Sequence, residues 1–494
     1  MFYLFFVLFV GLVLGAYFVC KYALKLDKQK FDNVMSKILK VCVIVYCALS
    51  LLTILLPDAL NLNYSESDLE NTNLGGLAIV KWLSCLAFIM LPLAVFFKKR
   101  TIRNIAIYFC TIISVVQLVF YPQFLEAYTA VIGRGLNSLS IASEGFKAFM
   151  LNPVFRSIVF GLILGLEIMI PVVLAVQEKH LFNVKSLKEW GYFALVTVLS
   201  LLSCIPISVP QHLFGYSNVI FEAWSLPHIL WLVFVIAEII VLYFVFRKKD
   251  QDSKMIMLFI LSLSLLMQYN QMFGAISINA ARFPFQLCNI GSYLVLVALI
   301  TKSKKIFDFT VIVNVVGVLF ALAMPDLDGE GFFYLYNMHF ILEHTNVLVI
   351  PILALLLNIF PRLDKKSLKH FFFGFLIYFA SVFVLGTLFN GIAVATENGF
   401  WSANYLFMFD QETAAGFIPF LGELFNVNFN IGIFTFYPLM LLVVYLVFNL
   451  ICFLVFGVIQ LVYFIKDKIQ AKRGGDNKEQ AVAEEQQPQL EEQA

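Results

Sequence analysis

The sequence predicts an all-α polytopic membrane protein with about thirteen transmembrane helices. Hydrophobic residues make up 61% of the 494-residue chain and charged residues only 13%, whereas about 25% of an average globular protein is charged. A soluble protein needs a polar exterior and has no room to bury so much apolar surface. Long apolar runs also alternate with short segments that hold most of the charge. These observations exclude a single large soluble enzyme.

The expected spans follow from the apolar runs between charged residues. A helix needs about 20 apolar residues to cross a bilayer core about 30 Å thick. The last run is long enough to tilt or to continue beyond the membrane. The thirteen expected spans are 3–20, 39–57, 78–97, 104–121, 157–176, 190–207, 228–246, 255–272, 286–301, 307–324, 342–360, 370–390 and 433–465.

Basic residues in the connections predict the orientation of the chain. If the stretch after the first span lies inside, the inner segments hold 29 of the 34 Lys and Arg residues. Because inner loops are enriched in Lys and Arg, this split predicts an outer N-terminus, an inner C-terminus and an odd number of spans. The tail, 466–494, is rich in Gln and Glu and is expected to be disordered and cytoplasmic.

Two stretches of the sequence read alike. Residues 85–122 and 288–325 both begin with Cys, end with Pro and carry a basic turn at the same place. A Lys-Ser-Leu-Lys sequence then follows at 185–188 and again at 366–369. This pattern predicts two parallel six-helix repeats plus a closing helix. The first repeat, 1–225, looks poor in polar residues, so any chemistry is expected in the second domain, 226–465.

Several other classes of site lack a signature. All eight cysteines lie in or at the ends of apolar spans, so disulfides are not expected, and neither Cys nor His shows a metal-binding spacing. No cofactor is indicated. The net charge of +2 argues against nucleic acid as a partner. Membrane lipids are the expected partners, and protein partners stay open.

Polar residues of the second domain gather at the outer ends of its spans. His228 opens one span, Asp326 follows another, and Glu343 and His344 lie at the start of a third. Charged groups at membrane depth are costly and usually face the interior of the bundle or a wet cavity. We therefore predict His344 as a general base, with Asp326 or Glu343 orienting it and His228 as a further catalytic candidate.

Four more residues are predicted to bind substrate, and one of them, Cys288, also has a structural explanation. Cys288 would accept an acyl group if its pKa were lowered, but a Cys in an apolar helix is more often a small buried hydrophobe. Glu238, in mid-span, would relay protons or pair with a polar group such as Asn314. The predicted substrate-binding residues are Arg282, Gln286, Cys288 and Asn404.

Short motifs in this domain carry a resemblance to a known family. They are Leu226-Pro227-His228, Pro284-Phe285-Gln286-Leu287-Cys288, Pro325-Asp326-Leu327, His344 and Asn404-Tyr405-Leu406. Residues 226–465 resemble the YwaF-type bacterial integral membrane proteins, which are distantly similar to a eukaryotic transmembrane family implicated in ether-lipid acyl transfer. The resemblance implies the same helical fold. Gln286 stands where the family has His, and Phe285 where the eukaryotic relatives carry the acyl-accepting Cys.

Three functions remain open at this stage, all in the plasma membrane of a bacterial cell. The first is an enzyme that transfers or hydrolyses acyl groups of lipids at the outer leaflet. The second is a transporter or permease, because parallel repeats suit alternating access. The third is a non-catalytic membrane scaffold or complex subunit. An enzyme needs only the outer polar cluster, whereas a carrier needs polar groups along a path from one face to the other.

Overall fold

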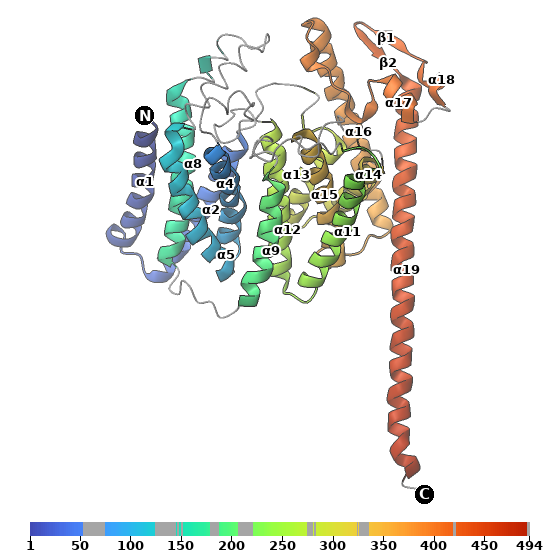
Figure 1. Cartoon of the computed structure of the whole chain (residues 1–494), viewed down its shortest axis with the longest axis horizontal. Coiled ribbons are helices and arrows are strands. Elements are labelled where there is room, and N and C mark those ends of the chain that lie inside the picture. The colour runs from blue at the N-terminus through green and yellow to red at the C-terminus, as the bar shows by residue number, and fades with distance from the viewer. Residues whose placement is uncertain are drawn as a thin grey trace.

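The computed structural model is a bundle of helices with one short hairpin (Figure 1). The helices before the middle of the chain are α1 Phe2–Phe18, continued by η1 Val19–Ala23, α2 Lys28–Leu52, α4 Gly75–Phe96, α5 Arg100–Ile105, η3 Ala106–Cys110, α8 Pro153–Gln177 and α9 Leu187–Ser203. The structure describes residues 1–52, 75–123, 145, 148–149, 152–177, 187–205, 221–273, 280, 283–323, 325, 335–417 and 421–491.

The second half contains both the longest helices and a group of short elements. Its long helices are α11 Leu226–Phe246, α12 Gln251–Phe273, α13 Leu287–Thr301, α14 Lys304–Ala323, α15 Leu335–Leu356, α16 Lys365–Ala395 and α19 Pro438–Glu491. Between α16 and α19 lie η6 Gly399–Trp401, η7 Tyr405–Phe407, α17 Gln411–Phe417, α18 Gly422–Phe425, and an antiparallel hairpin of β1 Phe429–Ile431 and β2 Phe434–Phe436. The long connection before α19 is therefore folded.

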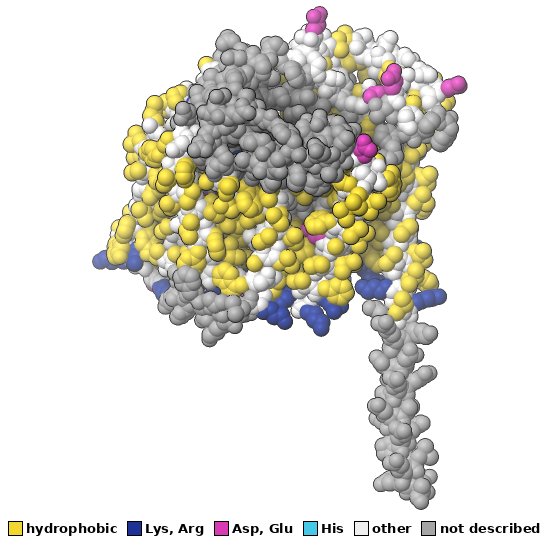
Figure 2. Space-filling view, in the orientation of Figure 1, with side chains coloured by type: hydrophobic (Ala, Val, Ile, Leu, Met, Phe, Trp, Pro, Cys, Tyr) yellow, Lys and Arg dark blue, Asp and Glu magenta, His cyan; other side chains and the backbone are white. Residues whose placement is uncertain are grey.

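Ten helical stretches within the described residues are long and apolar enough to cross a membrane, and α13 is a shorter apolar helix. Every one of the thirteen expected spans overlaps a helix of the structure. On the face shown in Figure 2, Lys and Arg side chains gather along one edge of an apolar band, the edge beyond which α19 projects. An all-α polytopic membrane protein is thus supported, while the exact number of spans and their orientation stay predictions.

The two halves pack in the same pairwise pattern. In the first half α8 contacts α1, α2, α4 and η3, and in the second half α15 contacts α11, α12, α13 and α14. Helix α12 also contacts α4 and α9 and so joins the halves. This correspondence is what two copies of a six-helix unit would produce, and the duplication itself stays a prediction.

Two glycines allow α1 to approach α8 closely. A Cβ atom at Gly161 would lie 3.0 Å from the backbone nitrogen of Phe6, and one at Gly165 would lie 2.5 Å from the ring of Phe9. Gly161 and Gly165 are four residues apart and share a helix face, which is the small-residue spacing that brings membrane helices together. This contact holds α1 in place at the edge of the bundle.

The C-terminal segment differs from the sequence prediction. Helix α19 continues to Glu491, although residues from 466 onward were expected to be disordered. Lys, Gln, Ala and Glu, which are common in this segment, have good helix propensity, and the membrane-spanning part of α19 supplies a preformed helix to extend. Arg362 pairs with Asp467 at 2.8 Å and fixes the beginning of the extension.

Candidate functional site

The predicted base and its neighbours lie in the first turns of α15. His339 and Glu343 are four residues apart and therefore share one face of the helix. The Nε2 atom of His339 lies 3.1 Å from Oε2 of Glu343, and both side chains are buried. Among the described residues, none donates a hydrogen bond to Oε1 of Glu343. One carboxylate oxygen is thus engaged by a histidine, and the other can accept a further donor.

His344 has a defined tautomer. Its Nδ1 lies 2.7 Å from the carbonyl oxygen of Phe340, and since a carbonyl can only accept, Nδ1 carries the proton. Nε2 is then the basic nitrogen, and no hydrogen bond to it comes from the part of the chain that the structure describes. The imidazole rests on the Phe340 ring with centroids 4.2 Å apart and is 6% exposed. The arrangement leaves His344 able to take up a proton at Nε2.

Cys288 and Tyr293 on α13 lie within electrostatic reach of Glu343. The Cys288 thiol is half-buried and donates to the Asn289 side-chain oxygen at 3.1 Å. Tyr378 of α16 donates to the carbonyl oxygen of Phe285 at 2.8 Å and so holds the turn that precedes α13. Helices α13, α15 and α16 therefore bring a thiol, a carboxylate and two phenols to one region, which we call the outer site because it lies at the end of the bundle that is predicted to face outward.

Asn314 lies deeper between the same helices, in the middle of α14. Its Nδ2 donates to the carbonyl oxygen of Val347 at 3.4 Å, and its side chain occupies the space where a Cβ of Gly291 would be. The hypothesis that Asn314 pairs with Glu238 is thus not matched, because the amide reaches α15 instead. Gly291 is needed so that α13 and α14 can enclose this amide.

His228 is completely occupied by backbone groups. Nδ1 accepts the Trp224 amide proton at 2.8 Å, so Nε2 carries the ring proton and donates to the carbonyl oxygen of Leu322 at 2.9 Å. The rings of Trp231 and Phe340 lie between His228 and His344. As arranged, His228 joins the start of α11 to the end of α14 and has no nitrogen available for a substrate.

Gln286 and Asn404 hold the connection after α16 onto α13. Gln286 donates from Nε2 to the backbone oxygen of Asn404 at 3.2 Å and accepts the Leu406 amide proton at 3.3 Å. The Asn404 side chain in turn accepts the Phe409 amide proton at 3.1 Å. These contacts place the connection over the start of α13, next to Cys288. The predicted residues Asp326 and Arg282 lie outside the described residues.

The outer end of the second half therefore combines a His–Glu pair, a second histidine with a basic nitrogen, and a cysteine, beneath a folded connection. Among the described residues, no group of three or more His, Cys, Asp and Glu side chains is arranged to hold a metal ion.

Residues 223–460 match the model of the TMEM164 family. The match covers just under half of the chain and runs from before α11 into α19, so it includes every described element of the outer site. It supports the expected similarity to a eukaryotic-like transmembrane family and leaves the YwaF-type assignment a prediction. Comparison with curated proteins and with solved structures gives no match.

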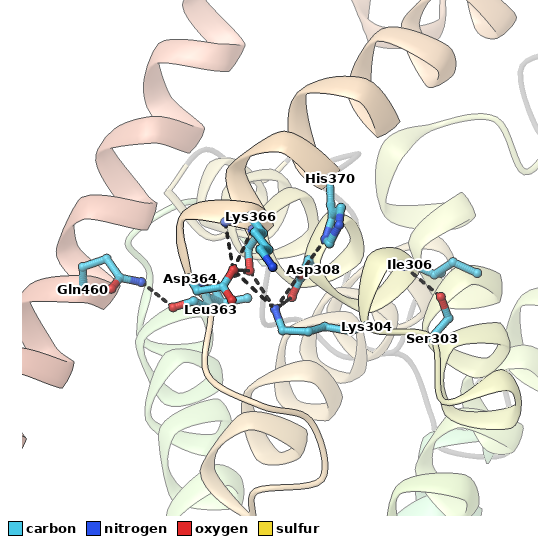
Figure 3. A network of polar contacts seen from close by, with 10 residues as sticks. Ser303, Lys304, Ile306, Asp308, Leu363, Asp364, Lys366, His370 and Gln460 are labelled. Carbon is cyan, nitrogen blue, oxygen red and sulfur yellow. Dashed lines mark hydrogen bonds and ion pairs between the residues drawn. The ribbon is translucent and has the colours of Figure 1, made fainter.

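The TMEM164-like segment also contains an inner polar network that the sequence reasoning missed (Figure 3). Asp308 is fully buried. Lys304 donates hydrogen bonds to both of its carboxyl oxygens, at 2.9 and 2.8 Å, and Nδ1 of His370 lies 2.8 Å from Oδ2. Lys304 also donates to Ser367, and Asp364 caps the start of α16. A Lys four residues before a buried Asp was the signal that could have revealed it.

A second missed cluster lies in the first half, outside the TMEM164-like segment. Glu167 of α8 is 5% exposed, and its two carboxyl oxygens lie 2.9 Å from the Tyr46 hydroxyl and 3.2 Å from the Ser114 hydroxyl. These groups come from three helices and meet in the middle of the bundle. The first half is therefore less depleted of polar residues than its sequence indicated.

Proposed function

We propose that the second half of the protein is a site of lipid acyl chemistry, either transfer or hydrolysis, at the outer leaflet of a bacterial plasma membrane. The observation that carries the proposal is the geometry of α15. His344 has its tautomer fixed by the Phe340 carbonyl, and the His339–Glu343 pair lies on the adjacent face. Ionisable residues inside a membrane bundle mark functional sites, and membrane lipids are the substrates that we propose for this one.

In this proposal Nε2 of His344 removes a proton from water or from the hydroxyl of an acceptor lipid. The oxygen then attacks the carbonyl carbon of an acyl ester, and the ester C–O bond breaks. The same histidine returns its proton to the departing alcohol oxygen. Glu343 supports the positive charge that develops on the imidazole, since the two residues are adjacent and interact electrostatically. No acyl-enzyme intermediate is required.

Cys288 offers a variant of this reaction in which the thiol first accepts the acyl group. The resemblance does not favour such a step, because Phe285 stands where the eukaryotic relatives carry the acyl-accepting Cys; what supports it is the electrostatic contact between Cys288 and Glu343. Because the negative charge of Glu343 opposes formation of a thiolate, the direct reaction through His344 is the one we propose first.

The test compares lipid profiles of cells that produce the native protein, His344→Ala or His370→Ala at equal abundance in the membrane. His370 lies in the inner network and serves as the matched control. We expect a lipid species that changes with the native protein and with the control variant but not with His344→Ala, since loss of a general base typically lowers a rate by about 10²–10⁴-fold. Three identical profiles would remove the proposal.

A proton-coupled carrier is the second candidate, and one specific observation favours it. Glu167 lies four residues before Pro171 in α8, and Glu343 lies eight residues before Pro351 in α15. A difference of four residues is about one helical turn, so each half has a buried carboxyl group on the same face of its corresponding helix. Uptake of protons by liposomes that contain the native protein, lost in Glu167→Gln and in Glu343→Gln, would favour this function over acyl chemistry.

A further inference from the structure

A carboxyl group lies in the middle of α11, far from both ends of the helix. Glu238 follows Leu226 by twelve residues and precedes Phe246 by eight. At a rise of about 1.5 Å per residue, these separations correspond to about 18 and 12 Å. Helix α11 is long and apolar enough to cross a membrane, and the hydrocarbon core is about 30 Å thick. Glu238 therefore lies near the middle of that core.

Glu238 belongs to the face of α11 that packs against the bundle. The buried residues of α11 recur every three or four positions and are His228, Trp231, Val235, Glu238, Leu242 and Phe246. Helix α15 is the main helix contact of α11. The opposite face is about half exposed and includes Val233, Ile236, Ile240 and Phe244. Glu238, at 8%, is the most exposed member of the buried face, so its carboxyl group lies between the bundle and the surrounding lipid.

The surroundings of Glu238 contain no group that would compensate for a negative charge. No charge or hydrogen bond from a described side chain acts on its carboxyl group. The residues one helical turn away on α11 are all apolar, namely Phe234, Val235, Val241 and Leu242. The ionisable residues of α15 all lie in its first half and are Tyr336, His339, Glu343 and His344. On α11 itself the other ionisable residues are His228 and Tyr243.

We propose that Glu238 is a proton-binding site inside the membrane and that its carboxyl group is protonated at neutral pH. An isolated carboxylate in an apolar interior is so costly that the group takes up a proton instead. Of the two roles expected from the sequence, proton binding and pairing with a polar group, these surroundings favour the first. The site is independent of the outer site and of the inner network, because it lies on another helix and shares no residue with them.

A lipid-soluble carbodiimide tests the proposal on the full chain in lipid bilayers. Dicyclohexylcarbodiimide adds to a protonated carboxyl group: the acid proton moves to a carbodiimide nitrogen, the carboxyl oxygen bonds to the central carbon, and rearrangement gives a stable N-acylurea. Peptide mass spectrometry then locates the added mass. We expect modification of Glu238 at pH about 7 and a progressive loss of modification as the pH rises, because only the acid form reacts in this way.

Infrared difference spectroscopy reads the protonation state directly at the same pH. The spectrum of the native protein minus that of Glu238→Gln should contain the carbonyl stretch of a carboxylic acid, with a downward shift in heavy water. Gln has nearly the same volume and no charge, so this variant is expected to fold. Glu397→Gln is the matched control, since Glu397 is exposed just after α16, and its difference spectrum should contain carboxylate bands instead.

Carboxylate bands in the Glu238 difference spectrum would overturn the proposal. If Glu238→Gln does not fold, the carbodiimide reaction of the native chain decides the question alone. Absence of modification at Glu238 between pH about 6 and 8 would then contradict a protonated carboxyl group beside the lipid. Neither measurement depends on lipid chemistry at the outer site, so failure of one proposal leaves the other intact.

Discussion

Replacement of Asp308 by Asn should be among the most destabilising single changes in the second half. Asp308 is fully buried, and Lys304 and His370 both lie 2.8 Å from it. The Asn side chain has nearly the same shape but no charge, so Lys304 loses its 2.8 Å ion pair and keeps only the longer one with Asp364 at 3.9 Å. Loss of one partner from a buried ion pair costs about 3–5 kcal/mol. Because the Lys304 and His370 side chains are each about a quarter exposed, we expect the loss of unfolding free energy to lie near the lower end of this range.

Asp467→Asn is the matched control, because Asp467 forms a similarly short ion pair with Arg362 but both side chains are about half exposed. An exposed pair is worth about 0–1 kcal/mol. The free energy of unfolding is measured by denaturant titration in the same detergent for both variants. Equal losses would refute the reasoning, since they would mean that burial of Asp308 adds nothing. A Lys304→Met, Asp308→Leu double variant should recover much of the loss because it removes both charges.

Three further predictions concern other contacts. Gly161→Leu should separate α1 from α8, since even a Cβ there would lie 3.0 Å from the Phe6 backbone nitrogen. Crosslinking between the two helices should therefore fall. The same change at Gly11, which faces open space, should have little effect. His228→Phe should lower the free energy of unfolding by about 2–4 kcal/mol, because a buried side chain loses two hydrogen bonds. An unchanged free energy of unfolding would contradict the structural role assigned to His228. For Asp250, burial raises the pKa, but hydrogen bonds from Lys99 and Ser253 and the charge of Lys99 outweigh it and lower the pKa to about 2. Its stabilisation is present above pH about 4 and is lost as the pH falls toward 2. Because half of the side chain is exposed, the free energy of unfolding should fall by at most about 1 kcal/mol. In Asp250→Asn, the free energy of unfolding measured over the same pH range should lack this decrease.

The spans were predictable because the sequence marks their ends with charge. Lys304 begins α14, Lys365 begins α16 and Arg247 follows α11, in each case within about six residues of a change between polar and apolar sequence. Such boundaries follow from the cost of charged side chains in hydrocarbon and need no knowledge of the tertiary fold. Helix ends that lack charge, such as the start of α15, give no comparable signal.

The roles of the histidines were not predictable from the sequence in the same way. His228 and His344 both lie near the outer ends of apolar helices, yet one is saturated by the Trp224 amide and the Leu322 carbonyl and the other keeps a basic nitrogen. Leu322, which accepts the hydrogen bond from Nε2 of His228, is 94 residues away in the chain. Hydrogen bonds to distant backbone groups depend on helix packing, and no local pattern of residues encodes them.

The Glu167 cluster escaped prediction for a related reason. Glu167 was visible as an acidic residue in an apolar run, but Tyr46 and Ser114 are separated from it by 121 and 53 residues. Tyr and Ser are common in membrane helices, and neither indicates a site until the three helices meet. Each span of the first half contributes only one of these polar groups, so no single span indicates that the first half contains a polar cluster.

The distribution of polar groups across the second half favours chemistry at the outer face over a path through it. Asn314 is the deepest of the outer polar groups, and Asp308 begins the inner network six residues earlier on the same helix. Six residues of helix span about 9 Å. Four of the five intervening residues are buried and apolar, and the fifth, Thr310, is buried with its hydroxyl bonded to the carbonyl oxygen of Ile306 on the same helix. A carrier would have to hydrate or open this segment during each cycle. An enzyme that acts on lipids at the outer leaflet, as we propose, would instead benefit from it, because the apolar layer would separate His344 from the inner aqueous phase.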